Sequence, residues 1–333
     1  MTDPWTLSAD GFAGLATPRA RLLVLAGHAI LAPSSHNTQP WRFRLGADRL
    51  DLLADRSRAL PVVDPEDRAL VISCGAALGH LRVAAEALGQ GLDVTLLPEP
   101  AEPDLLARIL PGPVRAPMRA ELLAAIHARR TTRAAFTTEA LAQPLPLAEA
   151  PGVTLHWRTA PAERHAIAEL VAEGDRAQMA DPGFRGELAA WVRSRHAASR
   201  DGMSGAAFGM PDLLSFMGAM AIRRFDMGAG QAAHDMALAE NSPALGVLTT
   251  PGDTPRDWLR AGEALSRATL ALTAAGLKHS YLNQPIEVPA LRLKLAALLG
   301  TREFPQILLR AGYGPDISPS VRRPLEEVLV EAG

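Results

Sequence analysis

Cysteine is almost absent from this 333-residue chain. The single cysteine, Cys74, rules out an internal disulfide, and the apolar run 71–78 around it indicates a buried core residue rather than a nucleophile. The nine histidines include no pair at the short spacing of a zinc site, so no metal site is predicted. Ser34 has no acid–base partners at motif spacing, which leaves a hydrolase triad unsupported.

An excess of either charge is also lacking. The 34 basic and 36 acidic side chains leave a net charge of −2, which gives no electrostatic reason to expect a nucleic-acid binder. No basic segment followed by an apolar one stands at the start, so no signal peptide is visible. The apolar run 213–222 is too short to span a bilayer. We therefore expect a cytoplasmic globular protein without a nucleic-acid or membrane partner.

Apolar spacing and turn residues predict an α+β protein in two units. The first unit, residues 1–98, is expected to contain helices at 18–31 and 66–89, and strands at 41–45, 50–52 and 94–97. Prolines are dense in residues 99–117, which is typical of a linker. The second unit, 118–333, is expected to contain helices at 118–128, 161–180, 184–198, 255–276, 288–298 and 320–331, and strands at 153–158, 245–250 and 307–309.

Six of the nine methionines fall in residues 203–236, several of them seven positions apart. Such a stripe on a helix indicates ordinary core packing in many proteins. The alternative is an adaptable lid whose thioethers pack over a flat aromatic ligand. The sequence leaves both interpretations open.

Residues 32–41, with the sequence APSSHNTQPW, concentrate polar side chains between an expected helix and an expected strand. Carboxamides supply both donors and acceptors, which suits them to the edge of a heterocycle. Pro33 and Pro40 stiffen the segment at both ends. A helix cap would need only one of these polar residues, so the cluster predicts a ligand-binding loop.

Two arginine clusters stand elsewhere. Residues 129–133, with the sequence RRTTR, combine guanidinium forks with hydroxyls, an array suited to phosphate oxygens. Basic residues are also favoured at helix C-termini, so this signal is weak on its own. Arg322 and Arg323 form a second basic site, which alone is more often a solvated pair.

These segments together resemble the nitroreductase family. Residues 32–41 resemble its APSSxNxQPW signature, and residues 129–133 are similar to its RRSxR segment. Residues 276–287, with the sequence GLKHSYLNQPIE, resemble its helix-to-PIE segment beside the flavin ring. Residues 308–314 and 322–325 are similar to its closing strand and basic tail. The resemblance extends from about residue 20 to residue 330.

The order of the motifs departs from the ordinary family, in which RRSxR precedes APSSxNxQPW in one chain and two chains pair. Here residues 32–41, the polar loop, lie in the first half, and the arginines of residues 129–133 lie in the second. This order resembles the tandem-domain, Acg-type branch. It implies a nitroreductase (FMN-dependent) fold with two fused half-domains, which form a pseudo-dimer with one flavin site between them. Whether such pseudo-dimers associate into a homodimer stays open.

The resemblance also implies a role for each residue of the motifs. The FMN phosphate would be held by Arg129, Thr131, Arg322 and Arg323. Arg133 would lie at the pyrimidine end of the ring, where positive charge stabilises the anionic reduced flavin. The opposite half would contribute Ser34, Ser35 and Asn37 to the ring or ribityl chain, with Gln39 and Trp41 supporting that loop. The backbone near flavin N5 would be that of Pro285, Ile286 and Glu287.

Two functions are compatible with such a site. The first is an FMN-dependent oxidoreductase, in which NAD(P)H reduces the flavin and a small nitroaromatic or quinone-like acceptor then reoxidises it. No catalytic side chain is needed, because the flavin performs the chemistry. The second is a flavin-binding or storage protein with little turnover, in which residues 203–236 cover the ring.

Overall fold

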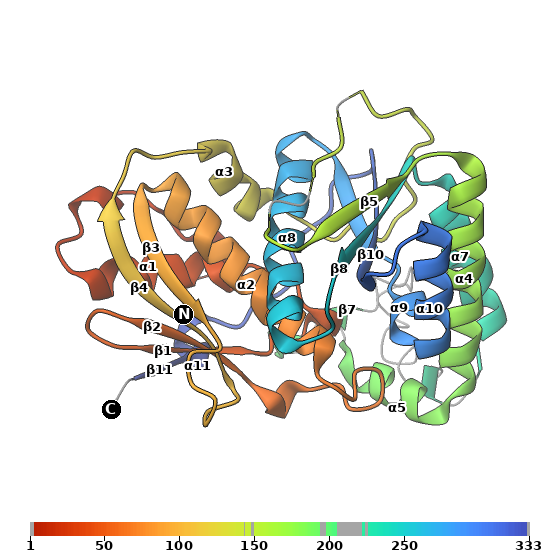
Figure 1. Cartoon of the computed structure of the whole chain (residues 1–333), viewed down its shortest axis with the longest axis horizontal. Coiled ribbons are helices and arrows are strands. Elements are labelled where there is room, and N and C mark those ends of the chain that lie inside the picture. The colour runs from red at the N-terminus through yellow and green to blue at the C-terminus, as the bar shows by residue number, and fades with distance from the viewer. Residues whose placement is uncertain are drawn as a thin grey trace.

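Two β-sheets with helices packed on them make up the chain, shown in a computed structural model that describes residues 3–142, 144–147, 150–193, 198–204, 222–223 and 226–331. In Figure 1 the first sheet lies on the left and the second on the right, with two long helices, α2 and α8, between them. The two-sheet arrangement agrees with the expected α+β class and with two fused half-domains.

The first half begins with the expected helix and hairpin. Its elements are α1 (Pro18–Ala29), β1 (Trp41–Leu45), β2 (Leu50–Ala54), α2 (Arg68–Ala87), β3 (Gln90–Leu96) and β4 (Leu105–Val114). Thr17 caps α1 by accepting a hydrogen bond from the backbone of Ala20, and Pro18 occupies the first helical turn. The sheet has the order β11-β1-β2-β4-β3, so the expected strands and helices of this half are confirmed.

Residues 99–117 are not a linker, and that prediction is wrong. They contain β4, which pairs antiparallel with β2 on one side and with β3 on the other. The pairing with β2 ends at Ile109, so Pro111 and Pro113 lie where β4 has a neighbour on one side only. A proline at such a place removes no ladder hydrogen bond on the open side, and the strand tolerates it.

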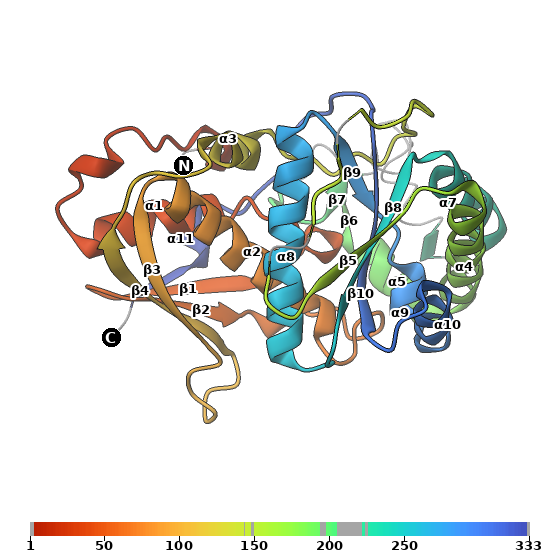
Figure 2. The same ribbon diagram turned by 45° about the horizontal axis from the view of Figure 1, so that its top comes forward.

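The second half forms the sheet β5-β8-β10-β9, antiparallel throughout. Figures 1 and 2 show α8 on one side of this sheet and α4, α7 and α10 on the other. The elements are α3 (Ala120–Ala128), β5 (Thr154–Arg158), α4 (Pro161–Ala180), α5 (Pro182–Trp191), β6 (Val192–Arg193), β7 (Met203–Ser204), α7 (Gly228–Asn241), β8 (Ala244–Thr250), α8 (Pro255–Ala274), β9 (Lys278–Tyr281), α9 (Gln284–Glu287), α10 (Pro289–Leu299) and β10 (Phe304–Gly312).

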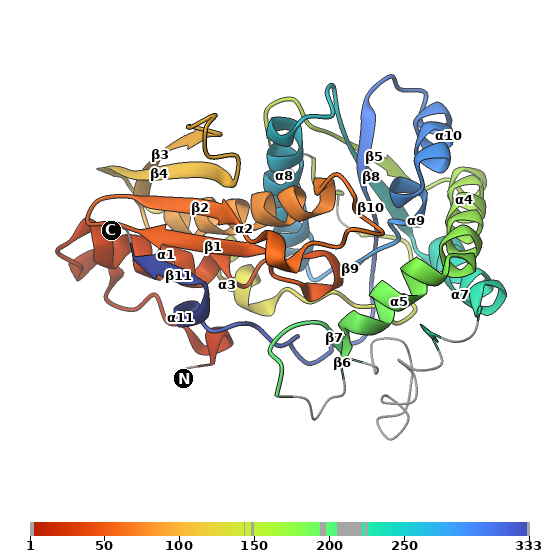
Figure 3. The same ribbon diagram turned by 90° about the horizontal axis from the view of Figure 1, so that it is seen from below.

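The C-terminal tail crosses back to the first half. It was expected to be helical over residues 320–331, but only α11 (Leu325–Val328) is helical, and β11 (Leu329–Glu331) follows it. β11 pairs in parallel with β1, and Figure 3 shows the two side by side. The edge of β1 offers unpaired backbone groups, and pairing with them ends the helix after one turn.

Helices α2 and α8 join the two halves at backbone contact. A Cβ on Gly75 would lie 2.3 Å from the carbonyl oxygen of Leu259, and one on Gly262 would lie 2.2 Å from that of Ile72. Only glycine allows so close an approach. The larger hydrophobic core is continuous across this contact, since it contains side chains of both sheets. One described helix, α2, is long and apolar enough to cross a membrane, but 83% of its apolar 18-residue stretch is buried inside the protein.

Most of the methionine-rich segment lies outside the described residues, including Met210, Met217 and Met220. The lid interpretation of residues 203–236 therefore stays a prediction. The end of the helix expected at 184–198 also falls partly outside them; the described helix there, α5, ends at Trp191.

Candidate functional site

The RRTTR segment leaves α3 and runs beside β9. Thr131 forms a bridge with His279, and the backbone N–H of Thr132 donates to the carbonyl of His279 at 2.9 Å. Arg310 of β10 fixes the segment from the other side. Its Nη2 donates to the carbonyls of residues 132, 133 and 134 at 3.1, 2.9 and 2.9 Å. The segment is therefore held along its backbone, and its side chains project from a fixed frame.

Arg129 and Arg322, the arginine pair, meet at the start of the polar loop. The Nη2 atoms of both donate to the carbonyl oxygen of Leu31, each at 3.3 Å. Arg322 also donates to the carbonyl of Ala32 at 3.2 Å and to Asn37 Oδ1 at 2.8 Å. Three motifs far apart in the sequence thus converge, as the resemblance implies.

The arginine pair is buried without a counter-charge. Arg129 is 2% exposed and Arg322 is 5% exposed, and within the described ranges no carboxylate forms an ion pair with either. Burial, followed by the charge of Arg129, holds the pKa of Arg322 well below its usual range. The Nε of each guanidinium lacks a hydrogen-bond partner among the described residues. Burying unpaired charge costs several kcal/mol, so this cluster fits an anionic ligand.

Two residues of β9 add unsatisfied polar atoms to the cluster. Both ring nitrogens of His279 and the hydroxyl of Tyr281 are buried without a partner in the described part of the chain. Burial, then the charge of Arg129, holds the pKa of His279 well below its ordinary value. Our sequence reasoning assigned neither residue a role. Their spacing of two in a strand, which places both side chains on one face, is the signal that could have found them.

The polar loop is a tight turn with its own hydrogen bonds. His36, Asn37 and Gln39 all have positive φ, at 49°, 55° and 52°. Ser34 Oγ accepts from the backbone N–H of Gln39 at 2.9 Å, and the N–H of Ser35 donates to Ser73 Oγ at 3.3 Å. Left-handed backbone at three non-glycine residues costs energy, and such strain concentrates at functional sites.

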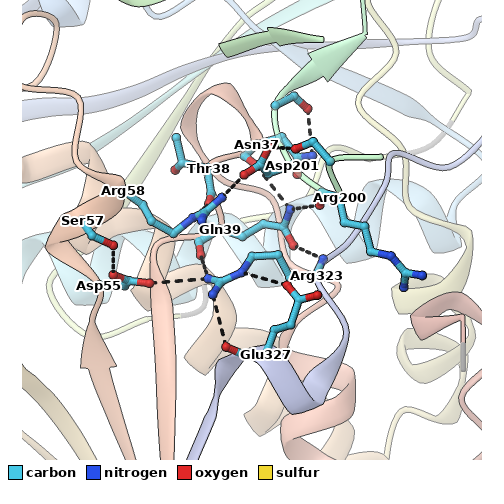
Figure 4. A network of polar contacts seen from close by, with 12 residues as sticks. Asn37, Thr38, Gln39, Asp55, Ser57, Arg58, Arg200, Asp201, Arg323 and Glu327 are labelled. Atoms are coloured by element: carbon cyan, nitrogen blue, oxygen red, sulfur yellow. Dashed lines mark hydrogen bonds and ion pairs between the residues drawn. The ribbon is translucent and has the colours of Figure 1, made fainter. Parts of the chain in front are cut away.

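The two carboxamides of this loop bind other parts of the chain (Figure 4). Asn37 Nδ2 donates to the carbonyl of Gly202 at 2.9 Å, and Gln39 Nε2 donates to that of Arg200 at 2.8 Å. Gln39 Oε1 accepts from the backbone N–H of Arg323 at 2.7 Å. These amides therefore tie the loop to residues 198–204 and to the tail, which is a supporting role for Gln39.

Arg323 lies in this second network rather than with the arginine pair. Its guanidinium donates to the carbonyl of Gln39 at 3.2 Å and lies 3.6 Å from the carboxylate of Asp55 and 3.8 Å from that of Glu327 (Figure 4). The structure does not place the guanidinium of Arg323 beside those of Arg129 and Arg322. Trp41 is fully buried in the larger core, under the loop.

Arg133 and α9 lie toward the second sheet. Arg133 Nη2 donates to the sulfur of Met203 at 3.3 Å. Burial, then the charge of Arg133, lowers the pKa of His36 to about 4, so this imidazole is neutral at pH 7. In α9 the side chains of Pro285 and Ile286 are buried. Glu287 Oε2 accepts from Gln178 at 2.7 Å, and burial raises the pKa of this carboxyl group.

An acid pair holds the start of α9. Gln284 Nε2 donates both to Asp175 Oδ1 at 3.0 Å and to Asp235 Oδ2 at 2.8 Å. Gly174 allows this arrangement, because a Cβ there would lie 2.7 Å from Cβ of Gln284. Asp175 and Asp235 are 4% and 9% exposed, and burial raises the pKa of each carboxyl group. Sequence reasoning missed both, since each resembles an ordinary helix acid.

Fold and site together define a two-half α+β protein with a buried cationic cluster where the halves meet. No family model matches the chain. A Mycobacterium tuberculosis protein whose name assigns it provisionally to the NAD(P)H nitroreductases is 33% identical over 321 residues, 90% of this chain and 88% of that one. The Acg protein of that organism, named in the same way, is 31% identical over 331 residues, 90% of this chain and 92% of its own. The chain belongs to the nitroreductase family.

Solved structures of nitroreductases are also similar to this chain, at lower sequence identity. The FMN- and NADPH-dependent nitroreductase NfnB of Sphigopyxis sp. strain HMH is 20% identical, with a TM-score of 0.41 over 64% of this chain and 99% of its own. NfnB of Mycobacterium smegmatis, solved with NADPH, is 18% identical with a TM-score of 0.35 over 62% of this chain and 96% of its own. The family assignment rests on the relatives in sequence.

Proposed function

We propose that this protein is an FMN-dependent oxidoreductase that takes electrons from NAD(P)H and passes them to a small nitroaromatic or quinone-like acceptor. The observation that carries the proposal is the arginine pair, buried without a counter-charge beside the polar loop. The names of the relatives, NAD(P)H nitroreductases, support the electron donor and the type of reaction.

The unsatisfied atoms of the site fit a phosphate group. Arg129 Nε, Arg322 Nε and Tyr281 Oη are buried donors without a partner in the described ranges, and a phosphate dianion supplies acceptors for all three. Thr131 lies beside them, since its hydroxyl accepts from Arg129 Nη1 at 3.4 Å. We assign the phosphate of FMN to Arg129, Thr131 and Arg322, and we assign Arg323 to clamping the polar loop.

FMN when bound supplies hydride acceptance and donation at flavin N5. The protein binds and orients it. Arg133 would supply positive charge to the pyrimidine end, where negative charge develops on reduction. Ser34 and Ser35 would offer hydroxyls from the first half, and the backbone of residues 285–287 would support the ring. Because the acid pair and Gly174 fix Gln284, this backbone is held before the ligand arrives.

A visible spectrum of the purified protein, followed by anaerobic addition of NADPH and then NADH, tests the proposal. We expect a flavin absorption band that bleaches within seconds with one of the two. A band that bleaches only with dithionite would instead favour the flavin-storage alternative. A protein that shows no flavin band and takes up no added FMN would overturn both functions.

Arginine variants test the phosphate assignment. Arg129→Met and Arg322→Met each remove charge-assisted hydrogen bonds worth about 1.5–3 kcal/mol, so the dissociation constant for FMN should rise about tenfold or more. Arg256→Met is the matched control, because this exposed arginine hydrogen-bonds, among the described residues, only to the carbonyl of Leu96. An unchanged affinity in both site variants would contradict the assignment. Quenching of flavin fluorescence on titration measures the dissociation constant for FMN.

A further inference from the structure

The N-terminal segment lies against the arginine pair, although no family motif includes it. The ring of Trp5 has the guanidinium carbon of Arg130 4.3 Å from its centroid and that of Arg322 5.2 Å away. Both distances are within the range of cation–π interaction, about 6 Å. One indole therefore contacts the RRTTR segment and the basic tail at once.

Backbone and side-chain hydrogen bonds fix the position of this indole. Trp5 Nε1 donates to the carbonyl of Ser320 at 2.8 Å. The carbonyl of Trp5 lies 3.3 Å from Nδ1 of His127, the residue two before Arg129. Because a carbonyl can only accept, Nδ1 of His127 carries a hydrogen. The Nε2 of His127 lies 3.2 Å from Nδ1 of His28, so the two imidazoles share a hydrogen bond. Burial, then His127, lowers the pKa of His28 to about 4.

A glycine on α1 anchors the rest of the segment. A Cβ on Gly27 would lie 3.0 Å from Cδ1 of Leu7, so the leucine packs directly on the helix backbone. Further along, Phe12 is buried in the larger core. Residues 3–15 thus bridge α1, the end of α3 and the tail, which are the three segments that bring the arginine pair together.

The indole also reduces the repulsion among the arginine charges of the site. Arg129, Arg130 and Arg322 carry like charges, and each of the other two lowers the pKa of Arg322. Without a ligand, like charges at close range drive the side chains apart. The negative face of an aromatic ring offsets part of this repulsion and restricts the guanidinium planes. Because the arginine side chains are ordered before the ligand binds, binding has a smaller entropic cost.

We propose that Trp5 is a positioning residue: held against both Arg130 and Arg322, it orders Arg322 for the ligand phosphate and slows release of the ligand. This role rests on the proposed function, which supplies a phosphate-bearing ligand. Trp5→Leu removes the aromatic face and keeps a smaller apolar side chain, whereas Trp5→Phe keeps an aromatic face. Both remove the hydrogen bond from Nε1 to Ser320, so the comparison between them isolates the ring. Gly27→Val displaces Leu7 and so loosens the segment without changing any aromatic or basic residue.

Dissociation of FMN from the loaded protein, followed by the recovery of free flavin fluorescence, is the first measurement. We expect the dissociation rate to rise roughly tenfold in Trp5→Leu and to stay within about threefold of the wild type in Trp5→Phe, with the association rate unchanged. Gly27→Val should also release FMN faster. Equal dissociation rates in the wild type and Trp5→Leu would overturn the proposal.

A measurement without ligand separates this proposal from the proposed function. Phenylglyoxal modifies accessible arginines, and mass spectrometry of the apoprotein reports modification at Arg322 and Arg130 peptide by peptide. We expect faster modification of both in Trp5→Leu than in the wild type and in Trp5→Phe, with Arg256 modified equally in all three. Unchanged rates would refute the positioning role even if FMN binds. Faster rates in a protein that binds no FMN would refute the proposed function and retain the positioning of the arginines.

Discussion

Replacing Asp175 by asparagine should make the protein more stable at pH 8 and remove part of its pH dependence. Asp175 is 4% exposed, shares Gln284 with Asp235, and has one carboxylate oxygen without a partner in the described part of the chain. Burial, then the charge of Asp235, raises the pKa of Asp175 from 3.8 to about 7. Glu287 of α9 raises it further, whereas Gln284 and Arg176 oppose the shift.

The sign follows from proton linkage. The folded state binds the proton of Asp175 more tightly than the unfolded state, so between pH 3.8 and about 7 the folded chain carries more protons. The stability contributed by this group is fully present below pH 3.8 and is lost as the pH rises through 7. The shift of 7 − 3.8 = 3.2 units corresponds to about 4 kcal/mol at 1.36 kcal/mol per unit. Asparagine, which never ionises, does not lose this contribution.

Urea unfolding at pH 5, 6, 7 and 8 measures the effect. The difference in the free energy of unfolding between Asp175→Asn and the wild type should shift in favour of the variant by about 2–3 kcal/mol from pH 5 to pH 8, because part of the total is already lost below pH 5. Asp93→Asn, at an exposed position of β3, is the control and should leave the slope unchanged. If Asp175→Asn and the wild type had the same pH slope, the assignment of the proton to this buried pair would be wrong.

Three further outcomes follow from the packing and the site. Gly262→Ala should destabilise the fold by about 3 kcal/mol or more in urea unfolding, because its Cβ would meet the carbonyl oxygen of Ile72 at 2.2 Å, whereas Gly186→Ala, with open space around it, should be close to neutral. Cys74 is fully buried, and burial raises the pKa of its thiol, so iodoacetamide should label it only after unfolding; labelling of the native protein, seen by mass spectrometry, would contradict this. Arg310→Met should weaken FMN binding about tenfold in fluorescence titration, since it removes three hydrogen bonds that hold the RRTTR segment, and an unchanged affinity would show that the segment is held by other contacts.

Patterns of neighbouring residues predicted the elements whose formation depends on residues close together in the sequence. Helical spacing and the proline at position 18 predicted α1, and a polar turn between alternating segments predicted the β1–β2 hairpin. Pro111 and Pro113 misled, because proline excludes a strand only where both neighbours are paired, and pairing is a property of the whole sheet. The same limit applies to the tail, whose β11 depends on the free edge of β1.

In the candidate site, the sequence predicted the segments better than the individual contacts. Arg322 and Arg323 were expected to act together, but successive side chains of an extended chain point to opposite sides. Only Arg322 therefore reaches Arg129, and Arg323 contacts Asp55 instead. Asp175 and Asp235 stand 60 positions apart on two helices, and no local signal indicates that one glutamine joins them.

The return of the tail to the first sheet has a consequence for how the chain is made. Arg322 bonds to Asn37 across 285 positions, and β11 pairs with β1 over a similar separation. During synthesis on the ribosome, the first half emerges with an open sheet edge, and Arg129, which follows it, lacks Arg322 until nearly all of the second half has been translated. A nascent chain paused before the tail should therefore be prone to edge pairing with its neighbours and unable to retain a phosphate ligand. Such contacts, distant in sequence, also predict slow folding.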